Sequence, residues 1–385
     1  MSVPLRIALV VDPLSARLFG GEHAACLARA LSSHGHEVGL FGASFAAPAD
    51  RSESRRQLDS PARDAGPAPL PIERRLRDRQ RQNGRRHLLD FSPRALIAYD
   101  AMSPTACMAA QAARRLRVPL VLVEHGSGGQ ISRTLIRGLS RVGSSLWGPY
   151  VRRTASCVVA LDPWSLAQAR REGFPLDRVR VVPHGVDTQR FRPGLVSSLG
   201  ARHRIIGRIV LAVGALESTS RHDLVIDAFA RTVGQRGDWS LVIAGEGSQR
   251  ARLRAIADCA GVGARVHWVG ELSEAELPGA LSSATLAVLA SSDPRAVLLA
   301  KLLACGVPIV AEAGGRAEFL VGDQCGVTVS RGDWAEGLSL AAGAPESRRR
   351  WSIEGRRIAE TRLDWSCVAR EFESAIDDRE ERLAG

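Results

Sequence analysis

The stretch Ser291–Val310, with the sequence SSDPRAVLLAKLLACGVPIV, decides the fold of this chain. Its pattern predicts a loop, a helix that begins just after Pro294, a tight turn at Cys305–Pro308 and a buried strand at Ile309–Val310. The first N–H groups of such a helix and the positive end of its dipole both favour a phosphate. The stretch therefore predicts a helix start at the edge of an α/β sheet, either with an anionic ligand or as an ordinary helix and strand.

Length and composition favour a globular protein of two domains. The 385 residues are enough for two medium α/β domains with separate cores. No apolar run approaches the roughly 18 residues that span a membrane, and no apolar signal-peptide core precedes the first strand, so we expect a cytoplasmic protein. The seven cysteines are scattered without metal-ligand spacing, which predicts small buried thiols and no metal site.

The charge of the chain is strongly basic and unevenly distributed. The formal net charge is +11, and residues 51–94 contribute more than half of it, with twelve Arg against six acidic residues. An excess of positive charge can favour binding to nucleic acid, to anionic lipid or to a phosphorylated substrate. Because aromatic residues make up only 5% and no nucleic-acid motif appears, we expect no nucleic-acid partner. The segment is either a solvated surface or a contact with an anionic membrane face.

Two parts of the chain open with the same pattern of buried strand, glycine loop and helix. In the first, a strand at 5–11 leads to Gly20 and Gly21. A later strand, at 119–123, delivers His125 to the sheet edge where ligands bind, as a base, a ligand contact or a simple loop residue. In the second part, a strand at 209–213 leads to Gly214. The first pattern of strand, glycine loop and helix predicts the opening of a nucleotide-fold half-domain.

These motifs resemble those of glycosyltransferase family 4, which are retaining nucleotide-sugar enzymes with the GT-B fold. The tail Ala304–Pro308 of the opening stretch matches the family pattern, whereas the two Glu positions of that pattern fall on Asp293 and Lys301. The Gly20–Glu22 loop also matches, and the turn Pro183–Asp187 resembles the family's interdomain signature with His184 in place of its usual Asn. The resemblance covers the chain outside the arginine-rich insert.

The resemblance implies an α/β protein with two Rossmann-like domains that face a cleft. Residues 1–190 would form the acceptor domain, with an arginine-rich insert or loop at 43–94. Residues 200–360 would form the nucleotide-sugar donor domain. Residues 361–385 would form a C-terminal helix that crosses back to the first domain.

The resemblance also implies the site residues. His125 would contact the transferred sugar, and Asp293 would hold its hydroxyl groups. The family's Arg and Lys that neutralise the donor diphosphate are replaced here by Ala215 and Ser220, so Arg221 takes part of their role. The full donor-binding set comprises Gly20, Gly21, Gly214, Arg221, Gly245, Glu246, Arg295, Ala296 and Lys301.

The expected function is transfer of a hexose from a UDP- or GDP-linked sugar to a glycan or lipid-linked acceptor, with retention and without a metal or other cofactor. Such an enzyme would serve cell-envelope polysaccharide or glycolipid synthesis, and residues 51–94 would contact the inner face of the plasma membrane. The altered donor positions leave an alternative. In that alternative the chain is an inactive relative that binds or regulates an active glycosyltransferase.

Overall fold

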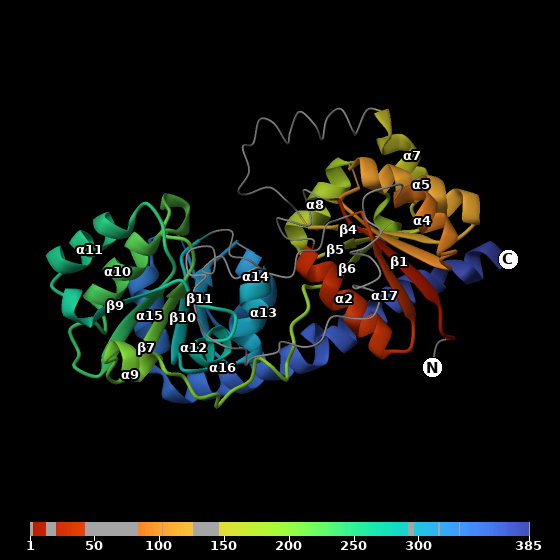
Figure 1. Ribbon diagram of the computed structural model, residues 1–385. Helices are drawn as coiled ribbons and strands as arrows, with labels where there is room; N and C mark the ends of the chain where they lie inside the picture. The colour runs from red at the N-terminus through yellow and green to blue at the C-terminus, as the bar shows by residue number, and fades with distance from the viewer. Residues whose placement is uncertain are drawn as a thin grey trace, which may run out of the picture. The chain divides into compact units, whose positions relative to one another are not determined.

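The computed structural model describes residues 3–12, 21–42, 84–101, 103–125, 146–291, 296–314, 316–330 and 332–384. The chain divides into two compact units (Figure 1). Unit 1 consists of Met1–Pro183 together with Trp365–Gly385, and unit 2 consists of His184–Asp364. Each unit is built on a six-stranded parallel sheet. The prediction of two Rossmann-like α/β domains is therefore confirmed.

The sheet of unit 1 has the strand order β2-β1-β3-β4-β5-β6. Its strands are β1 (Arg6–Val10), β2 (Glu37–Phe41), β3 (Ala95–Tyr99), β4 (Leu120–Glu124), β5 (Cys157–Ala160) and β6 (Val179–Val181). Its helices are α2 (Gly21–Ser33), α4 (Gly84–Asp90), α5 (Pro104–Leu116), α7 (Gly148–Thr154), α8 (Pro163–Arg171), the 3-10 turn η3 (Leu176–Arg178) and α17 (Trp365–Ala384). Ile7 and Leu9 pack in one apolar cluster and Ala8 and Val10 in another, so both faces of the sheet are covered.

The last helix, α17, belongs to unit 1 although it follows unit 2 in sequence. Val368, Phe372 and Ile376, spaced four residues apart on one helix face, pack in the same cluster as α2 (Figure 1). Polar contacts add to this packing, because Glu373 Oε1 lies 2.7 Å from His34 Nδ1 and 3.0 Å from His36 Nε2. Helix α17 is thus fixed both to α2 and to the connection between α2 and β2.

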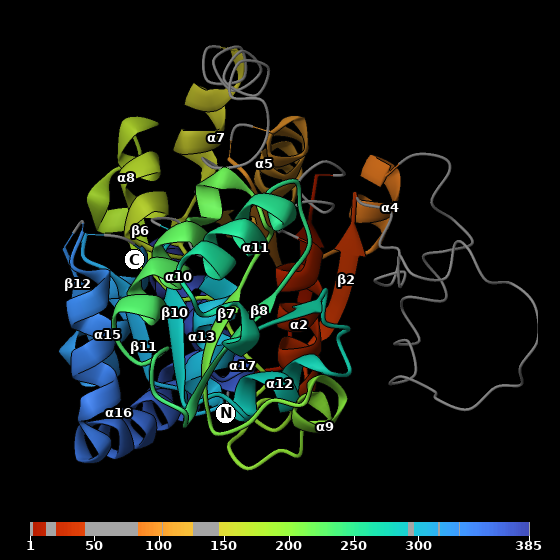
Figure 2. The same ribbon diagram turned by 90° about the vertical axis from the view of Figure 1, so that its left-hand side faces the viewer.

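The sheet of unit 2 has the strand order β12-β11-β10-β7-β8-β9, most of which can be followed across Figure 2. Its strands are β7 (Arg208–Val213), β8 (Trp239–Ala244), β9 (Val266–Gly270), β10 (Leu286–Leu289), β11 (Ile309–Glu312) and β12 (Gly326–Val329). Its α-helices are α9 (Leu199–His203), α10 (His222–Arg231), α11 (Arg250–Cys259), α12 (Leu277–Ser282), α13 (Ala296–Ala304), α14 (Arg316–Val321), α15 (Trp334–Gly343) and α16 (Pro345–Ile358). Short turns η4 (Ser218–Ser220), η5 (Gly263–Arg265) and η6 (Gly322–Gln324) and the π-helical turn η7 (Ala359–Leu363) complete it.

The stretch that decides the fold forms the expected elements. Helix α13 begins at Ala296, two residues after Pro294, and β11 begins at Ile309. Gly306 has φ +65° in the turn between them, and a Cβ there would lie 2.9 Å from Ser352 Oγ, so both the conformation and the space call for glycine. Among the described residues, no helix is both long and apolar enough to cross a membrane.

Candidate functional site

In unit 2, the connections that follow β7 and β10 leave the sheet at the carboxyl ends of neighbouring strands. Strand β7 lies between β10 and β8, so the order of the strands reverses beside it. In open parallel sheets, ligands bind at the carboxyl ends of the strands at such a switch point. The loop Gly214–Arg221 follows β7, and the chain after β10 leads to α13. These two connections therefore form the first place to look for a ligand site.

The loops after β7 and β8 are held together by main-chain contacts. Leu216 N–H donates to Glu246 O at 2.9 Å, and a Cβ on Gly245 would lie 2.0 Å from Gly214 O. Glu217 joins them by accepting hydrogen bonds from the N–H and hydroxyl of Ser248, at 3.1 and 2.8 Å, and these bonds lower the pKa of its carboxyl. Gly245 is thus required by the packing of the two loops, whether or not a ligand is present.

Glu246, the other predicted residue of the β8 loop, is exposed and pairs with Arg250 one helical turn later. Its carboxylate also lies against the backbone of Gly270, where a Cβ would come within 3.2 Å of Oε1. The carboxylate therefore sits between the ends of β8 and β9, on the exposed side of the loop.

Arg221 stands at the start of α10 in an unusual backbone conformation. Its φ and ψ are +51° and +36°, the left-handed region that a residue with a side chain seldom adopts. The guanidinium Nε lies 3.2 Å from Asp223 Oδ1, and the side chain is half exposed. No side chain of the described chain caps this helix, so Arg221 carries a positive charge beside the first N–H groups of α10.

His222, which follows Arg221, was missed by the sequence analysis. The residue is 4% exposed, and among the described residues neither Nδ1 nor Nε2 has a hydrogen-bond partner. Burial lowers the pKa of its imidazole, while the nearby main chain of Gly214 and Ala215 and the charge of Asp223 act in the opposite direction. Those main-chain groups lie near the ring without reaching hydrogen-bond geometry. The signal in the sequence was a polar residue directly after a glycine loop, where a buried helix face begins.

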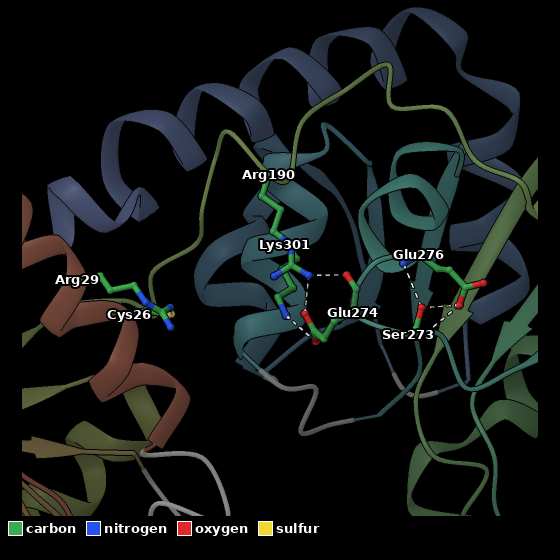
Figure 3. A network of polar contacts seen from close by, with 7 residues as sticks. All are labelled: Cys26, Arg29, Arg190, Ser273, Glu274, Glu276 and Lys301. Atoms are coloured by element: carbon green, nitrogen blue, oxygen red, sulfur yellow. Dashed lines mark hydrogen bonds and ion pairs between the residues drawn. The ribbon is translucent and has the colours of Figure 1, made fainter. Parts of the chain in front are cut away.

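Lys301 lies in the second turn of α13, with its side chain 11% exposed. Its Nζ is 4.0 Å from Glu274 Oε1 and 5.2 Å from the centroid of the Phe191 ring. Arg190 reaches the same carboxylate from the other side, with Nη2 2.8 Å from Oε2, so both cations point at Glu274 in Figure 3. The positive charge of Lys301, at a position where the family pattern has Glu, is therefore balanced by the carboxylate of Glu274, 27 positions earlier in the chain.

The catalytic candidate of unit 1, His125, directly follows β4. Its ring stacks on Tyr99 with the centroids 5.2 Å apart, and His23 lies edge-on to it at 6.0 Å. Nδ1 is 3.7 Å from Asp100 Oδ1. The side chain is 8% exposed, and Nε2 has no partner within the described part of the chain. A histidine held in this way can offer Nε2 to a ligand as donor or acceptor.

Three carboxyl groups, those of Glu124, Glu172 and Asp100, interact with one another near the end of β4, and Asp100 among them lies beside His125. Glu124 is buried and accepts a hydrogen bond from Ala101 N–H at 2.8 Å. Burial, followed by the nearby charges of Glu172 and Asp100, raises the pKa of Glu124 well above its ordinary value. Burial also raises the pKa of Glu172, whose Oε1 accepts a hydrogen bond from Gln168 at 3.0 Å. Within the described ranges, no three His, Cys, Asp or Glu residues are arranged to hold a metal ion.

The predicted site residues thus fall into three groups. Gly214, Arg221, Gly245 and Glu246 gather at the loops after β7 and β8 of unit 2, while Ala296 and Lys301 lie on α13. His125 and Gly21, the buried first residue of α2, belong to unit 1. Gly20, Asp293 and Arg295 lie outside the described residues.

Comparison with known proteins matches both parts of the chain to glycosyltransferases. Residues 20–190 match the model described as Glycosyltransferase Family 4, and residues 206–358 match the model described as Glycosyl transferases group 1. The D-inositol 3-phosphate glycosyltransferase of Acidothermus cellulolyticus is 31% identical over 229 residues, which cover 55% of this chain and 51% of that protein. Glycogen synthase of Mycobacterium tuberculosis is 28% identical over 260 residues, covering 66% of this chain and 61% of that protein. The matched region spans about half the length of the first of these relatives.

Solved structures share the fold across nearly the whole chain. HepE of Anabaena in complex with UDP superposes with a TM-score of 0.69 at 17% identity, covering 97% of this chain and 100% of that chain. Sucrose-phosphate synthase of Thermosynechococcus elongatus has a TM-score of 0.68 at 18% identity, with 99% and 100% covered. Because the two family models divide most of the sequence between them and the two sheets have the matching architecture, the protein belongs to the family 4 glycosyltransferases of the GT-B fold.

Proposed function

We propose that the protein transfers a hexose from a nucleotide sugar to a glycan or lipid-linked acceptor, with retention of configuration. The observation that carries this proposal is the switch point of unit 2, where Gly214 and the uncapped start of α10 follow β7. A diphosphate suits this place because helix N–H groups and a cation converge there. UDP is the first nucleotide to test, since HepE was solved with UDP and with UDP-glucose.

In this proposal the two units have different tasks. Unit 2 would hold the donor, with Arg221 and the start of α13 at the diphosphate. The roles proposed for Asp293 at the sugar hydroxyls and for Arg295 at the diphosphate fall on residues outside the described ranges. Unit 1 would offer Nε2 of His125 to a sugar hydroxyl, because that atom is buried and has no partner among the described residues. Catalysis would then rest on positioning and on stabilising the charge of the leaving diphosphate, without a metal or another cofactor.

A second candidate function is that of an inactive relative that binds or regulates an active glycosyltransferase. The observation that favours it is the pairing of Lys301 with Glu274, which occupies a predicted donor position with an internal contact. Ala215 and Ser220 also leave the loop after β7 with fewer cations than the family pattern has. Nucleotide binding without turnover would identify this second candidate.

The proposal includes a contact of residues 51–94 with an anionic membrane face. Only residues 84–94 of that segment are described, as α4 and the chain that leads into β3. Sedimentation with vesicles of anionic and of neutral lipid tests this part, and equal binding to both would remove it. The synthesis of cell-envelope glycans on the cytoplasmic side is the setting that such a contact would suit.

A thermal-shift titration tests the donor proposal. The full chain is titrated with UDP, GDP, ADP and TDP and with their common sugar conjugates, because ligand at about 100 times its Kd stabilises a fold by about 2.7 kcal/mol. A saturable shift with one nucleotide class, followed by release of that nucleotide in the presence of an acceptor, supports the transferase. A saturable shift without turnover against a broad acceptor panel supports the second candidate. Absence of any shift contradicts both.

A further inference from the structure

A small space above Gly214 is bordered by two polar side chains. A Cβ built on Gly214 would lie 3.7 Å from His222 Nε2 and 3.8 Å from Ser220 Oγ. Because glycine carries no Cβ, no side chain of residue 214 fills the place between these two polar atoms. It lies at the carboxyl end of β7 and at the start of the ten-residue helix α10.

Burial of His222 at this position destabilises the fold unless its ring nitrogens have hydrogen-bond partners. An imidazole transferred from water into the protein interior loses hydrogen bonds at both nitrogens, and buried polar atoms that stay unpaired destabilise the fold. Both nitrogens of His222 are buried without a partner among the described residues, although Val225 and Ile226 of the same helix are packed in the apolar core. A ligand that accepts a hydrogen bond from Nε2 would remove part of that cost.

The electrostatic surroundings define what the ligand is. Burial lowers the pKa of His222, but the nearby main chain of Gly214 and Ala215 favours the protonated ring, as does Asp223. Arg221 precedes the ring and is paired with Asp223. The other elements packed on α10 carry Arg250, Arg252, Arg254 and Asp258 in α11 and Glu336 in α15, and none of these is a cause of the shift. An anion placed above Gly214 would supply the missing stabilisation of the charged ring.

We propose that His222 is a proton-linked ligand of the donor diphosphate, which takes up one proton from the solvent when a nucleotide sugar binds above Gly214. This inference rests on the proposed function and adds a residue and a pH dependence to it. The phosphate oxygen accepts a hydrogen bond from Nε2–H, Ser220 donates a second, and the N–H groups at the start of α10 add to them. The ring would thus provide a positive charge only in the bound state, where the anion stabilises it.

The sign of the pH dependence follows from this coupling. The pKa of the free imidazole is lowered, and the bound diphosphate raises it, so affinity increases as the pH falls through the interval between the two values. UDP-glucose is the suitable probe, because its doubly esterified diphosphate does not change charge between about pH 5.5 and 8, where histidine titrates. Free UDP would add the titration of its own terminal phosphate.

Isothermal titration calorimetry of the full chain with UDP-glucose, repeated in buffers of different ionisation enthalpy, counts the protons exchanged. At pH 6.5 we expect a net uptake that disappears by about pH 8. His222→Gln retains a hydrogen-bond donor but not the charge, and we expect it to lose the uptake and roughly tenfold in affinity at pH 6. His267→Gln is the matched control, because burial also lowers the pKa of His267 in β9, away from this loop, and it should bind like wild type.

Nuclear magnetic resonance of the wild-type imidazoles covers the case in which His222→Gln does not fold. The pKa of one unit 2 histidine should rise by about one unit or more on addition of UDP-glucose, since a charge-assisted bond of ordinary strength corresponds to such a shift. Binding without proton uptake, or uptake that survives in a folded His222→Gln variant, would overturn the role of His222 and leave the donor site standing. Absence of binding by UDP-glucose and by every other nucleotide sugar tested would overturn the proposed function itself.

Discussion

Replacing Arg221 by glycine separates the backbone of the loop from its charge. Arg221 adopts φ +51° and ψ +36°, a conformation that glycine reaches without steric conflict. The same substitution removes the guanidinium that we place at the diphosphate. We therefore expect Arg221→Gly to fold normally and to bind a nucleotide sugar weakly.

The expected change in stability is the difference of three small terms. Relief of the left-handed conformation favours glycine by about 1–2 kcal/mol, and the greater freedom of glycine in the unfolded chain opposes it by about 0.5–1 kcal/mol. The half-exposed contact with Asp223, at 3.2 Å, contributes about 0–1 kcal/mol. The free energy of unfolding should thus lie between about 1 kcal/mol below and about 1.5 kcal/mol above that of wild type, a change in Tm of about 6 °C or less. Loss of a charged phosphate contact, in contrast, lowers affinity by about ten- to a hundredfold.

The chain provides a matched control in Arg204. This exposed residue has nearly the same backbone conformation, φ +51° and ψ +41°, at the end of α9 in the same unit. Both variants are melted and then titrated calorimetrically with the nucleotide sugar that binds the wild type. Equal affinities of Arg204→Gly and Arg221→Gly would refute the contact between Arg221 and the ligand. Loss of more than about 2 kcal/mol of stability in Arg221→Gly alone would refute the argument about its backbone.

Three further predictions concern packing, charge and pH. Gly245→Ala should destabilise unit 2 by about 2 kcal/mol or more in urea unfolding, because its Cβ would lie 2.0 Å from Gly214 O. Gly343→Ala, whose Cβ would have no atom within 4 Å, should leave the stability nearly unchanged, and equal unfolding midpoints of the two variants would contradict the prediction. Lys301→Glu places a carboxylate near Glu274, whose Oε1 is now 4.0 Å from Nζ, and should lower the free energy of unfolding by about 1–2 kcal/mol. Lys301→Met should not show this loss, and adding Glu274→Gln to Lys301→Glu should reverse it, as a double-mutant cycle can measure. Glu172→Gln should stabilise unit 1 by about 1 kcal/mol at pH 8 and not at all near pH 4.5, because a raised pKa makes the folded protein lose stability as the pH rises above the pKa of Glu in the unfolded chain. An equal gain in stability at both pH values would contradict this, and Glu37→Gln, at an exposed position, is the control.

The sequence predicts the elements whose periodicity is strong. The strand predicted at 119–123 corresponds to β4, and those predicted at 5–11 and 209–213 correspond to β1 and β7, each within one residue at either end. The switch from strand to helix at the glycine loops also follows from the pattern. Strand β12 was not predicted, because Gly326–Val329 spans only four residues. Short strands at a sheet edge depend on their neighbours, here Ile309–Glu312, more than on their own residues.

The site is less predictable than the fold, since its residues meet through tertiary contacts. Nothing near Lys301 in sequence indicates that Glu274 and Phe191 surround its ammonium. Gly245 was predicted to approach a ligand, yet the backbone of Gly214 already occupies the place of a Cβ. His222 drew no attention because a single histidine in a helix is most often on the surface. Its significance arises only from burial without a partner, a property of the folded chain.

Hydrogen–deuterium exchange of the full chain, with and without saturating nucleotide sugar, tests the central claim most directly. The account places the donor diphosphate at the switch point of unit 2, against the loop after β7 and the starts of α10 and α13. Peptides that cover residues 214–224 and 296–300 should therefore gain protection when the ligand binds, because ligand oxygens accept from their N–H groups. Protection confined to unit 1, or to the far end of the unit 2 sheet, would contradict the account.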